Sequence, residues 1–302
     1  MGPKRSPIFQ FFDNLLKNPY FLISPAILIV LVMTVYPTIY GIIISFTNYS
    51  ITEHIGVSPE FVGFRNYLKH FNNSVFQLVL RNTFVYMISV VIGIILISVL
   101  LGLFLNKTNR VYTFVQSVVF SPSILSFVSV AILFAWLYDN DGLFNYLLIT
   151  IGREPLRWLR DERTSLLSII IVAVWKDIGY GSLLIIAGLQ SIPTYVYESA
   201  KLDNANPWTT LTKITLPMLS PTLFFMLITF VINSFRAFDV SFNMTKGGPR
   251  SSSLLLVQYI YDEGYRNFRM GSAMAASIIL FIIVSAISFI NFKFISNKVH
   301  YQ

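Results

Sequence analysis

The sequence predicts an all-α, polytopic membrane protein with six transmembrane helices. Its 302 residues are 55% hydrophobic and only 12% charged, and their mean hydropathy is +0.66. Soluble domains carry charges on about a quarter of their residues, so this composition is typical of a membrane protein. The apolar runs are continuous and lack the alternation of barrel strands, which favours helices.

Six segments are long enough and apolar enough to be spans. A hydrocarbon core about 30 Å thick requires roughly 20 apolar residues per helix. The segments that meet this requirement are Phe21–Phe46, Phe84–Leu105, Val115–Leu137, Leu166–Leu189, Leu219–Phe238 and Met270–Phe292. Polar residues near the end of the fifth segment, including Arg236, make that boundary the least sharply defined.

The first segment could be either a cleaved secretory signal or a retained span. Its apolar run is much longer than a signal core, and no small-x-small cleavage site follows it, so we interpret it as a span. Lys4, Arg5 and Lys17 precede it and place the N-terminus in the cytoplasm. The expected organisation is a cytoplasmic arm (1–20), a membrane domain (21–292) and a cytoplasmic tail (293–302).

Six spans also place the loop after the fourth span on the cytoplasmic side. Lys107 and Arg110, in the short loop after the second span, agree with an inner position. Counted over the whole chain, however, basic residues are slightly more numerous in the outer loops. The predicted orientation therefore depends on the first span and on the loop after the fourth span.

Several chemistries are disfavoured by what the sequence lacks. Without cysteine there are no disulfides, lipid-anchored thiols or thiolate metal sites. His54, His70 and His300 are scattered, and no His/Asp/Glu cluster has metal-ligand spacing, so no metal site is expected. No nucleophile–base arrangement stands out, and no Gly-x4-Gly-Lys-Ser/Thr loop for ATP occurs. The net charge of +8 could indicate nucleic-acid binding, but no basic stripe with interleaved aromatic residues is present.

The polar segment after the fourth span (193–217) predicts a helix-turn-helix at the membrane surface. Thr194, preceded by a proline, opens a short helix and is available as its cap. Asn204 is suited to end this helix because asparagine tolerates a positive φ. Asn206 and Pro207 are typical of the N-cap and first turn of a second helix.

On this second helix one face is apolar, and the helix is expected to break where the chain re-enters the membrane. Trp208, Leu211 and Ile214 share the face. Pro217 and Pro221 are expected to cause the break. An ordinary amphipathic linker at the membrane surface is the alternative interpretation.

The order of residues in this loop resembles the coupling loop of permeases in binding-protein-dependent ATP-binding-cassette (ABC) importers. That loop usually contains Glu-Ala-Ala, two residues, Asp-Gly-Ala, and later Ile-x-Leu-Pro. The matching residues are Glu198, Ala200, Asp203, Ala205, Ile214, Leu216 and Pro217. Ser199 replaces an alanine and is small enough for the same packing. Asn204 replaces a glycine and is the next-best residue for a positive φ.

The resemblance extends over nearly the whole chain and indicates the carbohydrate-uptake branch of these importers. Its further motifs are Tyr36-Pro37, Ser45–Tyr49, Phe61–Tyr67, Arg81–Phe84, Met244–Pro249 and Tyr259–Tyr261. In this order they resemble the first of the two permeases in such systems. That permease is akin to the larger permease of the maltose transporter without its extra N-terminal spans.

The resemblance implies a type I ABC importer permease fold, a bacterial cell membrane location and import of a sugar or oligosaccharide. The chain would be a transport subunit rather than an enzyme and would bind no cofactor itself. Its expected partners are a second homologous permease, a cytoplasmic ABC ATPase dimer that hydrolyses the ATP, an extracytoplasmic substrate-binding protein and membrane lipid, but no nucleic acid.

The resemblance also assigns residues that would couple transport to the ATPase. They are Glu198, Ser199, Ala200, Asp203, Asn204 and Ala205. Glu198 is expected to anchor to a basic residue of the ATPase, and Ala200 to be the close-packing contact. Asp203 and Asn204 would form the turn that holds the second helix.

Polar and charged residues within the fourth and fifth spans are candidates for the translocation path. An ionisable residue inside a span costs about 2.5–3.5 kcal/mol on insertion scales, so it usually has a function. Sugars stack on aromatic faces and hydrogen-bond to planar polar groups. The candidates are Trp175, Lys176, Asp177, Tyr180, Asn233, Ser234, Arg236 and Asp239. In the resembled maltose permease these two segments line the central cavity. The additional charges here leave open an acidic sugar, a glycerol-phosphate-like ligand or another oligosaccharide.

The same charged residues could instead form ion pairs between helices without contacting a substrate. Lys176 and Asp177 are adjacent, so they point about 100° apart and are not expected to pair with each other. Arg236–Asp177 and Lys176–Asp239 pairs are both possible. Asn82, Thr83 and Tyr86 in the second span are weaker candidates, whose alternative role is hydrogen bonding between helices.

Small residues at the start of the sixth span predict a close-packing face for the partner permease. They are Gly271, Ser272, Ala273, Ala275, Ala276 and Ser277. Two other function classes are less well supported. A stand-alone secondary transporter should show an internal repeat, and none is evident. A membrane enzyme would need a pair such as Asp139 and Asp141, which more simply form a turn before Gly142.

Overall fold

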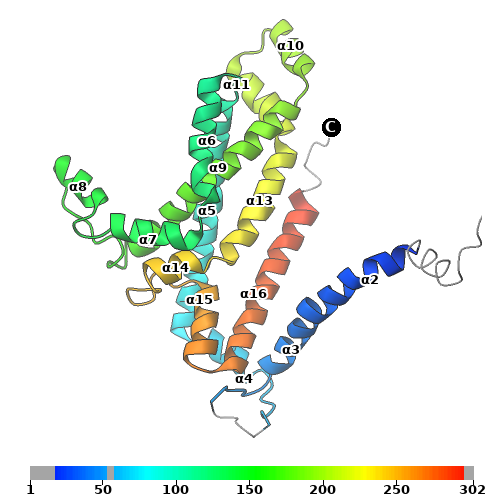
Figure 1. The fold of residues 1–302 in the computed structure, drawn as a ribbon, viewed down its shortest axis with the longest axis vertical. Helices are drawn as coiled ribbons and strands as arrows, with labels where there is room; N and C mark the ends of the chain where they lie inside the picture. Colours follow the sequence, from blue (N-terminus) through cyan, green and yellow to red (C-terminus); the bar gives the residue numbers. More distant parts are fainter. Residues whose placement is uncertain (1–17, 53–57, 296–302) are drawn as a thin grey trace, which may run out of the picture.

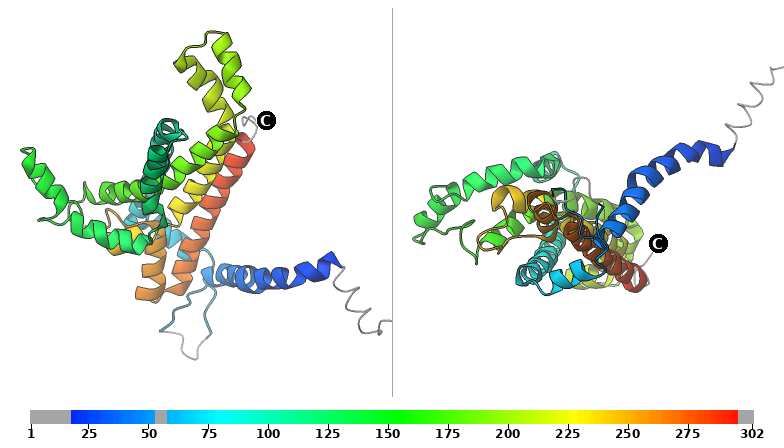
Figure 2. Two further views of the ribbon diagram at one scale, coloured as in Figure 1. Left: turned by 45° about the horizontal axis from the view of Figure 1, so that its top comes forward. Right: turned by 90° about the horizontal axis from the view of Figure 1, so that it is seen from below.

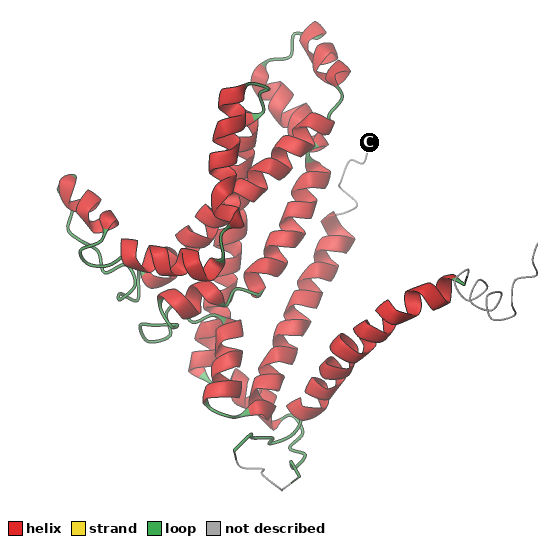
Figure 3. Cartoon of the chain, in the orientation of Figure 1, coloured by secondary structure: helices red, strands yellow, loops and turns green. Residues whose placement is uncertain are grey.

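The structure is a computed structural model of the chain and describes residues 18–52 and 58–295. These residues form helices, turns and loops, and their only β interaction is one isolated bridge between Thr47 and Phe61 (Figure 3). The all-α prediction is therefore confirmed.

Four long helices form the centre of the fold. They are α5 (Ser74–Leu105), α9 (Ser165–Ser191), α13 (Ser220–Phe235) and α16 (Met270–Ile290) (Figure 1). Helix α5 packs along α9 and α13, and α13 also contacts α16. Their facing side chains form an apolar core that includes Ile94, Ile169, Ile185, Phe230 and Phe235.

The helices that could cross a membrane agree with the six predicted spans. Four are continuous: Pro19–Ser45, Ser74–Leu105, Ser165–Ser191 and Met270–Lys293. Two strongly bent pairs could each be one more span: Arg110–Ile124 with Phe127–Leu137, and Pro207–Met218 with Ser220–Phe235. By length and composition, the described residues thus provide four spans, or up to six.

The first span diverges from the bundle. It consists of α2 (Pro19–Val30), the π turn η1 (Leu31–Val35) and α3 (Tyr36–Ser45). Figure 2 shows it leaving the bundle sideways in both views. Its buried residues lie in α3, which packs on α16, and none lies in α2. Most of its apolar surface is therefore not covered by this chain.

The third span is not the single helix that the sequence predicts over Val115–Leu137. Helix α6 (Arg110–Ile124) and helix α7 (Phe127–Leu137) meet at an angle of 98°. Leu125 between them has extended backbone angles, and the Ser126 side chain accepts a hydrogen bond from the Val128 N–H at 3.2 Å. The serine cap satisfies a new helix N-terminus, so the chain can restart a helix in another direction.

Two other span boundaries also differ from the predictions. The second span starts at Ser74 rather than Phe84, because Asn73 caps it by accepting from the Val75 N–H at 2.8 Å. The fifth span ends at Phe235 rather than Phe238, and a separate helix, α14 (Asp239–Met244), follows.

A glycine permits the closest approach between α6 and α9. A methyl group at Gly179 would lie 2.2 Å from the carbonyl oxygen of Val119 and 2.7 Å from the Cα atom of Phe120. Because backbone atoms of α6 occupy that space, no other residue fits at this crossing without moving the helix.

The predicted packing face for a partner permease is wrong, because this chain covers it itself. Gly271, Ser272, Ala273, Ala275 and Ala276 are buried within the chain. They pack against α3, against α4 (Arg65–Phe71), and against α15 (Leu256–Tyr261) with its π extension η3 (Asp262–Arg266). A methyl group at Gly271 would lie 2.1 Å from the Thr47 carbonyl oxygen.

Asn82 and Thr83 hold a loop at the end of the bundle opposite the 193–217 loop, which we call the distal end. The Asn82 amide donates to the carbonyl oxygens of Ser251 (2.8 Å) and Leu254 (3.3 Å). The Thr83 hydroxyl accepts from the Leu256 N–H at 2.9 Å. The Thr83 bond reaches the first residue of α15 and so joins two helices, as the alternative interpretation stated, whereas Asn82 bonds to a loop and not to a helix.

A buried histidine joins three elements at the same end. His70 of α4 bonds through Nε2 to the Ser272 carbonyl oxygen at 2.8 Å and through Nδ1 to the Tyr259 hydroxyl at 3.1 Å. A carbonyl only accepts, so Nε2 carries the proton and Nδ1 accepts from tyrosine. The Ser272 hydroxyl then donates to the Glu263 carboxylate at 3.0 Å. This arrangement suits neutral histidine, in which Nδ1 is an acceptor.

The stability of the protein should therefore fall as the solution is acidified. Burial lowers the pKa of His70 below its ordinary value, although Ser272 and Glu263 oppose this shift. The folded state favours the neutral form, so this contribution to stability is complete above the unfolded pKa of about 6.5 and is lost as the pH falls below it. We expect the melting temperature in detergent to drop between pH 7.5 and 5, and to drop less in His70→Gln. Equal pH profiles for both proteins would contradict this assignment.

Candidate functional site

A polar cavity of about 400 Å³ lies beside the central helices. Six of the eight predicted path residues line it: Lys176, Asp177, Asn233, Ser234, Arg236 and Asp239. Tyr86 of α5, which the sequence indicated as a weaker candidate for the path, also lines the cavity. The two helical segments singled out in the sequence therefore do meet at one cavity.

The structure does not place the two predicted aromatic residues in the wall of the cavity. Neither Trp175 nor Tyr180 is among the residues that line the cavity. The Trp175 ring packs against Phe134, with 4.9 Å between ring centroids. Tyr180 is 38% exposed, and its ring centroid lies 6.2 Å from that of Phe230, which lines the cavity. Aromatic surface in the cavity comes instead from Tyr86 and from three phenylalanines: Phe127, Phe230 and Phe238. With 27 phenylalanines in the chain, no sequence signal distinguished these three.

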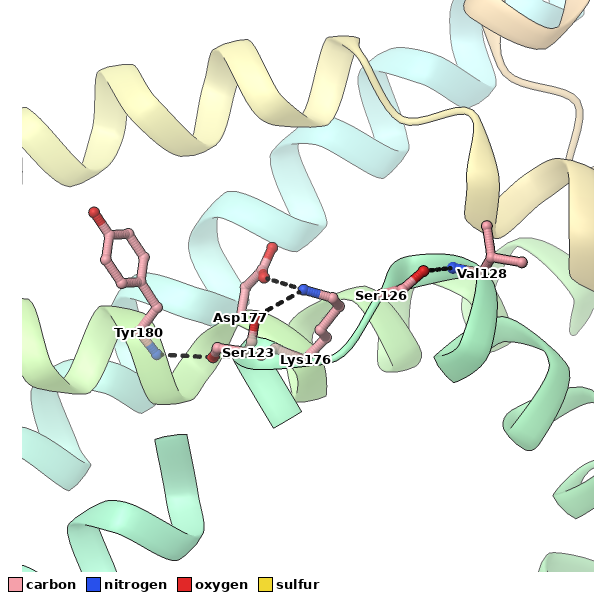
Figure 4. A network of polar contacts seen from close by, with 6 residues as sticks. All are labelled: Ser123, Ser126, Val128, Lys176, Asp177 and Tyr180. Atoms are coloured by element: carbon pink, nitrogen blue, oxygen red, sulfur yellow. Dashed lines mark hydrogen bonds and ion pairs between the residues drawn. The ribbon is translucent and has the colours of Figure 1, made fainter. Parts of the chain in front are cut away.

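Lys176 and Asp177 form an ion pair, contrary to the prediction. The Lys176 Nζ atom lies 3.6 Å from Asp177 Oδ1, and both side chains are largely buried (Figure 4). The long, flexible lysine side chain bends back over the helix surface, so the difference in direction between adjacent residues does not prevent the contact. The proposed pairs with Arg236 and Asp239 are not found among the described residues.

The same lysine stabilises the bend between α6 and α7. Its Nζ atom donates to the Ser123 carbonyl oxygen at 3.4 Å and lies 4.4 Å from the centroid of the Phe127 ring. The Ser123 hydroxyl donates to the Lys176 carbonyl at 2.8 Å and accepts from the Tyr180 N–H at 3.1 Å (Figure 4). Ser123 is in the last turn of α6, where carbonyl groups lack helical partners. Lys176 thus supplies the donor that the broken helix lacks.

The charges that line the cavity balance. Lys176 and Asp177 neutralise each other, and Arg236 and Asp239 add one charge of each sign. In the part of the chain that the structure describes, neither Arg236 nor Asp239 belongs to an ion pair.

The polar groups still available to a ligand are few. The Ser234 hydroxyl already donates to the Phe230 carbonyl at 2.7 Å. Asn233 and Arg236 are exposed in this chain, and Asp239 is partly exposed. Together they offer amide, guanidinium and carboxylate groups, which can satisfy several hydroxyls at once.

The first helix of the 193–217 loop, α10 (Thr194–Leu202), ends in a Schellman turn. Asn204 has a φ of 52°. Its N–H donates to the Lys201 carbonyl at 3.0 Å, and the Ala205 N–H donates to the Ala200 carbonyl at 2.9 Å. These two bonds back to the last helical turn define the motif. The prediction that Asn204 ends the helix is confirmed.

The second helix begins as predicted and breaks between Pro217 and Pro221, the two prolines expected to end it. Asn206 caps it by accepting from the Thr209 N–H at 2.7 Å. Helix α11 (Pro207–Thr210) then continues through the π turn η2 (Leu211–Thr215) and α12 (Leu216–Met218), and a bend of 61° leads into α13. Pro217 does not break the run, because the π turn shifts the hydrogen bonding just before this residue, which has no N–H.

Two smaller predictions about the loop are also wrong. Thr194 is the first helical residue rather than the cap, and Pro193 holds the cap position without a side-chain hydrogen bond. Ala200 is only 6% exposed because other residues of this chain cover it. Its carbonyl oxygen accepts the hydrogen bond from the Ala205 N–H that closes the turn.

The tip of the loop is exposed and combines apolar with charged side chains. Glu198, Ser199, Asp203 and Asn204 are exposed, and Ala205 is half-buried. Figure 1 shows α10 projecting beyond the ends of the central helices. Large apolar residues are exposed beside them: Tyr195, Leu202 and Trp208. Tyr195 and Leu202 were not among the residues predicted from the sequence, although large apolar residues in an otherwise polar loop are a recognisable signal.

Comparisons with known proteins agree with one another. The family described as binding-protein-dependent transport system inner membrane component matches residues 89–301. The lactose transport system permease protein LacF of Rhizobium radiobacter is 31% identical over 294 residues, which cover 95% of this chain and 96% of LacF. The arabinooligosaccharides transport system permease protein AraP of Halalkalibacterium halodurans is 32% identical over 289 residues, which cover 94% of this chain and 90% of AraP.

A solved structure extends the comparison to three dimensions. It is a bacterial alginate ABC transporter in complex with an alginate pentasaccharide-bound periplasmic protein. One of its chains is 25% identical to this chain with a TM-score of 0.76, over 90% of this chain and 91% of that one. The predicted type I ABC importer permease fold is therefore confirmed.

The Lys176–Asp177 ion pair should contribute more to the stability of the protein than to substrate binding. Removing one partner of a buried pair leaves an uncompensated charge, which costs about 3–5 kcal/mol. We expect Asp177→Ala to lower the melting temperature in detergent, and Lys176→Met/Asp177→Ala to recover most of the loss. Asp239→Ala is the control, since no ion partner of Asp239 is found among the described residues. A double variant no more stable than Asp177→Ala would refute this role.

Proposed function

This chain belongs to the family of binding-protein-dependent transport system inner membrane components, and we propose that it forms half of the translocation path of an ATP-driven ABC importer for an uncharged sugar or oligosaccharide. It is a transport permease and a multi-pass membrane protein rather than an enzyme. The observation that carries the proposed substrate class is the cavity whose charges balance.

The cavity supports an uncharged substrate for two reasons. Its ionised groups sum to zero, and the buried lysine already has a carboxylate partner, so no excess charge attracts an anion. Asn233, Arg236 and Asp239 can hydrogen-bond to hydroxyls while Phe127 and Phe230 offer faces for stacking. Lactose and arabinooligosaccharides, named for two relatives, are uncharged, whereas alginate, named for the solved structure, is acidic.

The exposed 193–217 loop supports coupling to a separate cytoplasmic ATPase. Its two helices are held by a Schellman turn and by the Asn206 cap, and the second continues into α13, which lines the cavity. A displacement of the loop would thus be transmitted to Asn233 and Arg236 through one bent helical element. In this proposal Glu198 pairs with a basic residue of the ATPase, and ATP is hydrolysed by that partner. The chain itself binds no cofactor.

The orientation and the remaining partners follow from the same assignment. If the coupling loop faces the cytoplasm, both chain ends do too, and α9, with 27 residues, extends about 40 Å from the loop to the distal end outside the membrane. The extracytoplasmic binding protein would deliver the sugar there. The diverging first span supports a second permease as partner, because an apolar helix that its own chain does not cover can pack on a neighbour within the lipid.

The first test is purification of the chain with the permease, ATPase and binding protein encoded beside it. We expect a complex of two permeases and an ATPase pair whose ATP hydrolysis rises when loaded binding protein is added. A chain that purifies alone and transports a sugar into liposomes without ATP would overturn the proposal.

Changes at the coupling turn should separate assembly of the membrane domain from transport. Asn204→Pro cannot adopt a positive φ and lacks the N–H that bonds to Lys201, so we expect normal membrane insertion but no ATP-driven uptake. Asn204→Gly allows the same φ and should retain uptake, which makes it the matched control. Glu198→Lys should behave like Asn204→Pro. Wild-type uptake by both damaging variants would exclude this loop from coupling.

A change in the cavity should weaken transport without affecting the ATPase. We expect Arg236→Gln to lower uptake of a neutral oligosaccharide about tenfold, since it removes a charged hydrogen-bond donor worth roughly 1.5–3 kcal/mol. Basal ATP hydrolysis should not change. Ser234→Ala, which removes a cavity hydroxyl already bonded to Phe230, should stay close to wild type. Faster uptake of a carboxylated sugar than of neutral sugars by wild type would contradict the substrate class.

A further inference from the structure

We infer that a pocket rich in arginine and lysine at the distal end binds a carboxylate side chain of the extracytoplasmic substrate-binding protein. This inference rests on the proposed function, because it assigns a surface to one of the partners proposed above. We call this site the basic pocket. It has a volume of about 390 Å³ and lies where α7 ends, beside the segment 157–160 and the C-terminal end of α14.

The lining of the basic pocket has an excess of positive charge. Arg157, Arg160 and Lys246 line it, and Asp139 is its single acidic lining residue. The three cationic side chains belong to exposed residues, and none is in an ion pair within the described ranges 18–52 and 58–295. Neighbouring charges do pair, as Arg250 does with Glu162 at 3.3 Å. The pocket therefore presents cations that form no ion pair with any residue of the described ranges.

The basic pocket is distinct from the cavity proposed for the sugar. No residue lines both, although α7 and α14 contribute to each of them. Residues 157–160 precede the start of α9, and the coupling loop follows its other end, so the pocket and the loop lie at opposite ends of this helix (Figure 1). An anion in this pocket would thus be outside the translocation path, on the face proposed to meet the binding protein.

One wall of the pocket is built around a buried asparagine. The Asn145 amide nitrogen of α8 (Leu143–Thr150) donates to the carbonyl oxygens of Asp139, Asn140 and Leu156 at 3.0–3.2 Å. Its oxygen accepts from the Leu156 N–H and from the Trp158 indole, both at 3.0 Å. Every hydrogen-bonding group of this amide is used. The turn that carries Asp139 and the segment that carries Arg157 and Arg160 are consequently held in a fixed relation.

The opposite wall holds its lysine in an unfavourable backbone conformation. Lys246 has a φ of 51°, in the left-handed region that residues other than glycine rarely adopt. The loop is fixed by the Ser253 hydroxyl, which lies 2.7 Å from both the Thr245 hydroxyl and the Gly248 carbonyl. Nothing in the packing requires lysine there, since the residue is exposed. In this conformation the Lys246 residue lines the pocket.

A protein carboxylate fits this site better than the transported solute does. Arginine guanidinium groups pair with carboxylates through two parallel hydrogen bonds, and two arginines with one lysine in a preformed pocket favour an acidic side chain. Unpaired charges at the edge of an interface attract a partner of opposite charge and orient it during encounter. The balanced charges of the sugar cavity show no such preference, so the two sites select different chemistry.

The test uses the complete importer in lipid nanodiscs and the binding protein encoded beside it. We expect Arg157→Glu/Arg160→Glu to weaken binding of that protein by roughly tenfold or more and to reduce its dependence on salt. Basal ATP hydrolysis should stay at the wild-type level, which shows that the importer is assembled. Arg153→Glu is the matched control, because Arg153 is exposed on the same segment but does not line the pocket. Lys246→Glu tests the same pocket independently, from its other wall.

The outcomes separate this inference from the proposed function. If wild-type ATP hydrolysis responds to the binding protein and all variants bind it equally well, the basic pocket is not a docking point. The same conclusion follows if the Arg153→Glu control weakens binding as much as the double variant does. If the double variant binds the protein normally but loses uptake of an acidic solute, the pocket recognises the solute instead. If the wild-type importer does not respond to any binding protein, the proposed function itself fails, and this inference fails with it.

Discussion

The contact between Lys176 and the broken third span is the interaction on which the rest of the structure depends. Inside a bilayer each backbone carbonyl needs a partner from the protein, because no water is available. The end of α6 leaves such a carbonyl at Ser123, and the ammonium group of Lys176 approaches it to 3.4 Å while pairing with Asp177. The chain can therefore turn by 98° within the membrane domain, which a continuous helix could not do.

That turn positions residues of both the polar cavity and the basic pocket. Because α7 runs across the bundle, it reaches α14 and the end of α13, and Phe127 forms part of the wall of the polar cavity. The other end of α7 carries Tyr138 and Asp139 to the basic pocket. A single lysine, buried and paired, thus has a positioning role that differs from the substrate contact suggested by its location in a span.

Local rules predicted the structure of the 193–217 loop well and the cavity only in part. Asn204 has a positive φ and Asn206 is a side-chain cap, as their residue types indicate, since both features depend on a few adjacent residues. The cavity depends on which face of each helix turns inward. Trp175 satisfies the chemistry of a sugar site, yet it packs on Phe134 because its face of α9 is turned toward α7 and not toward α13. Tyr180 is on the side of α9 that meets α13, with its ring centroid 6.2 Å from that of Phe230, but it does not line the cavity.

Composition and local sequence patterns were enough to predict the membrane class, the approximate spans, the helix-turn-helix of the 193–217 loop and the family. These features are encoded in composition, in runs of apolar residues and in motifs of fixed spacing, all of which are local. Only the tertiary structure decided that the small residues after Gly271 are covered by the chain's own first span and α4, that Lys176 pairs with its neighbour, and that three phenylalanines face the cavity. Each of these depends on contacts between segments distant in sequence, where helix direction and side-chain rotation together select the neighbours.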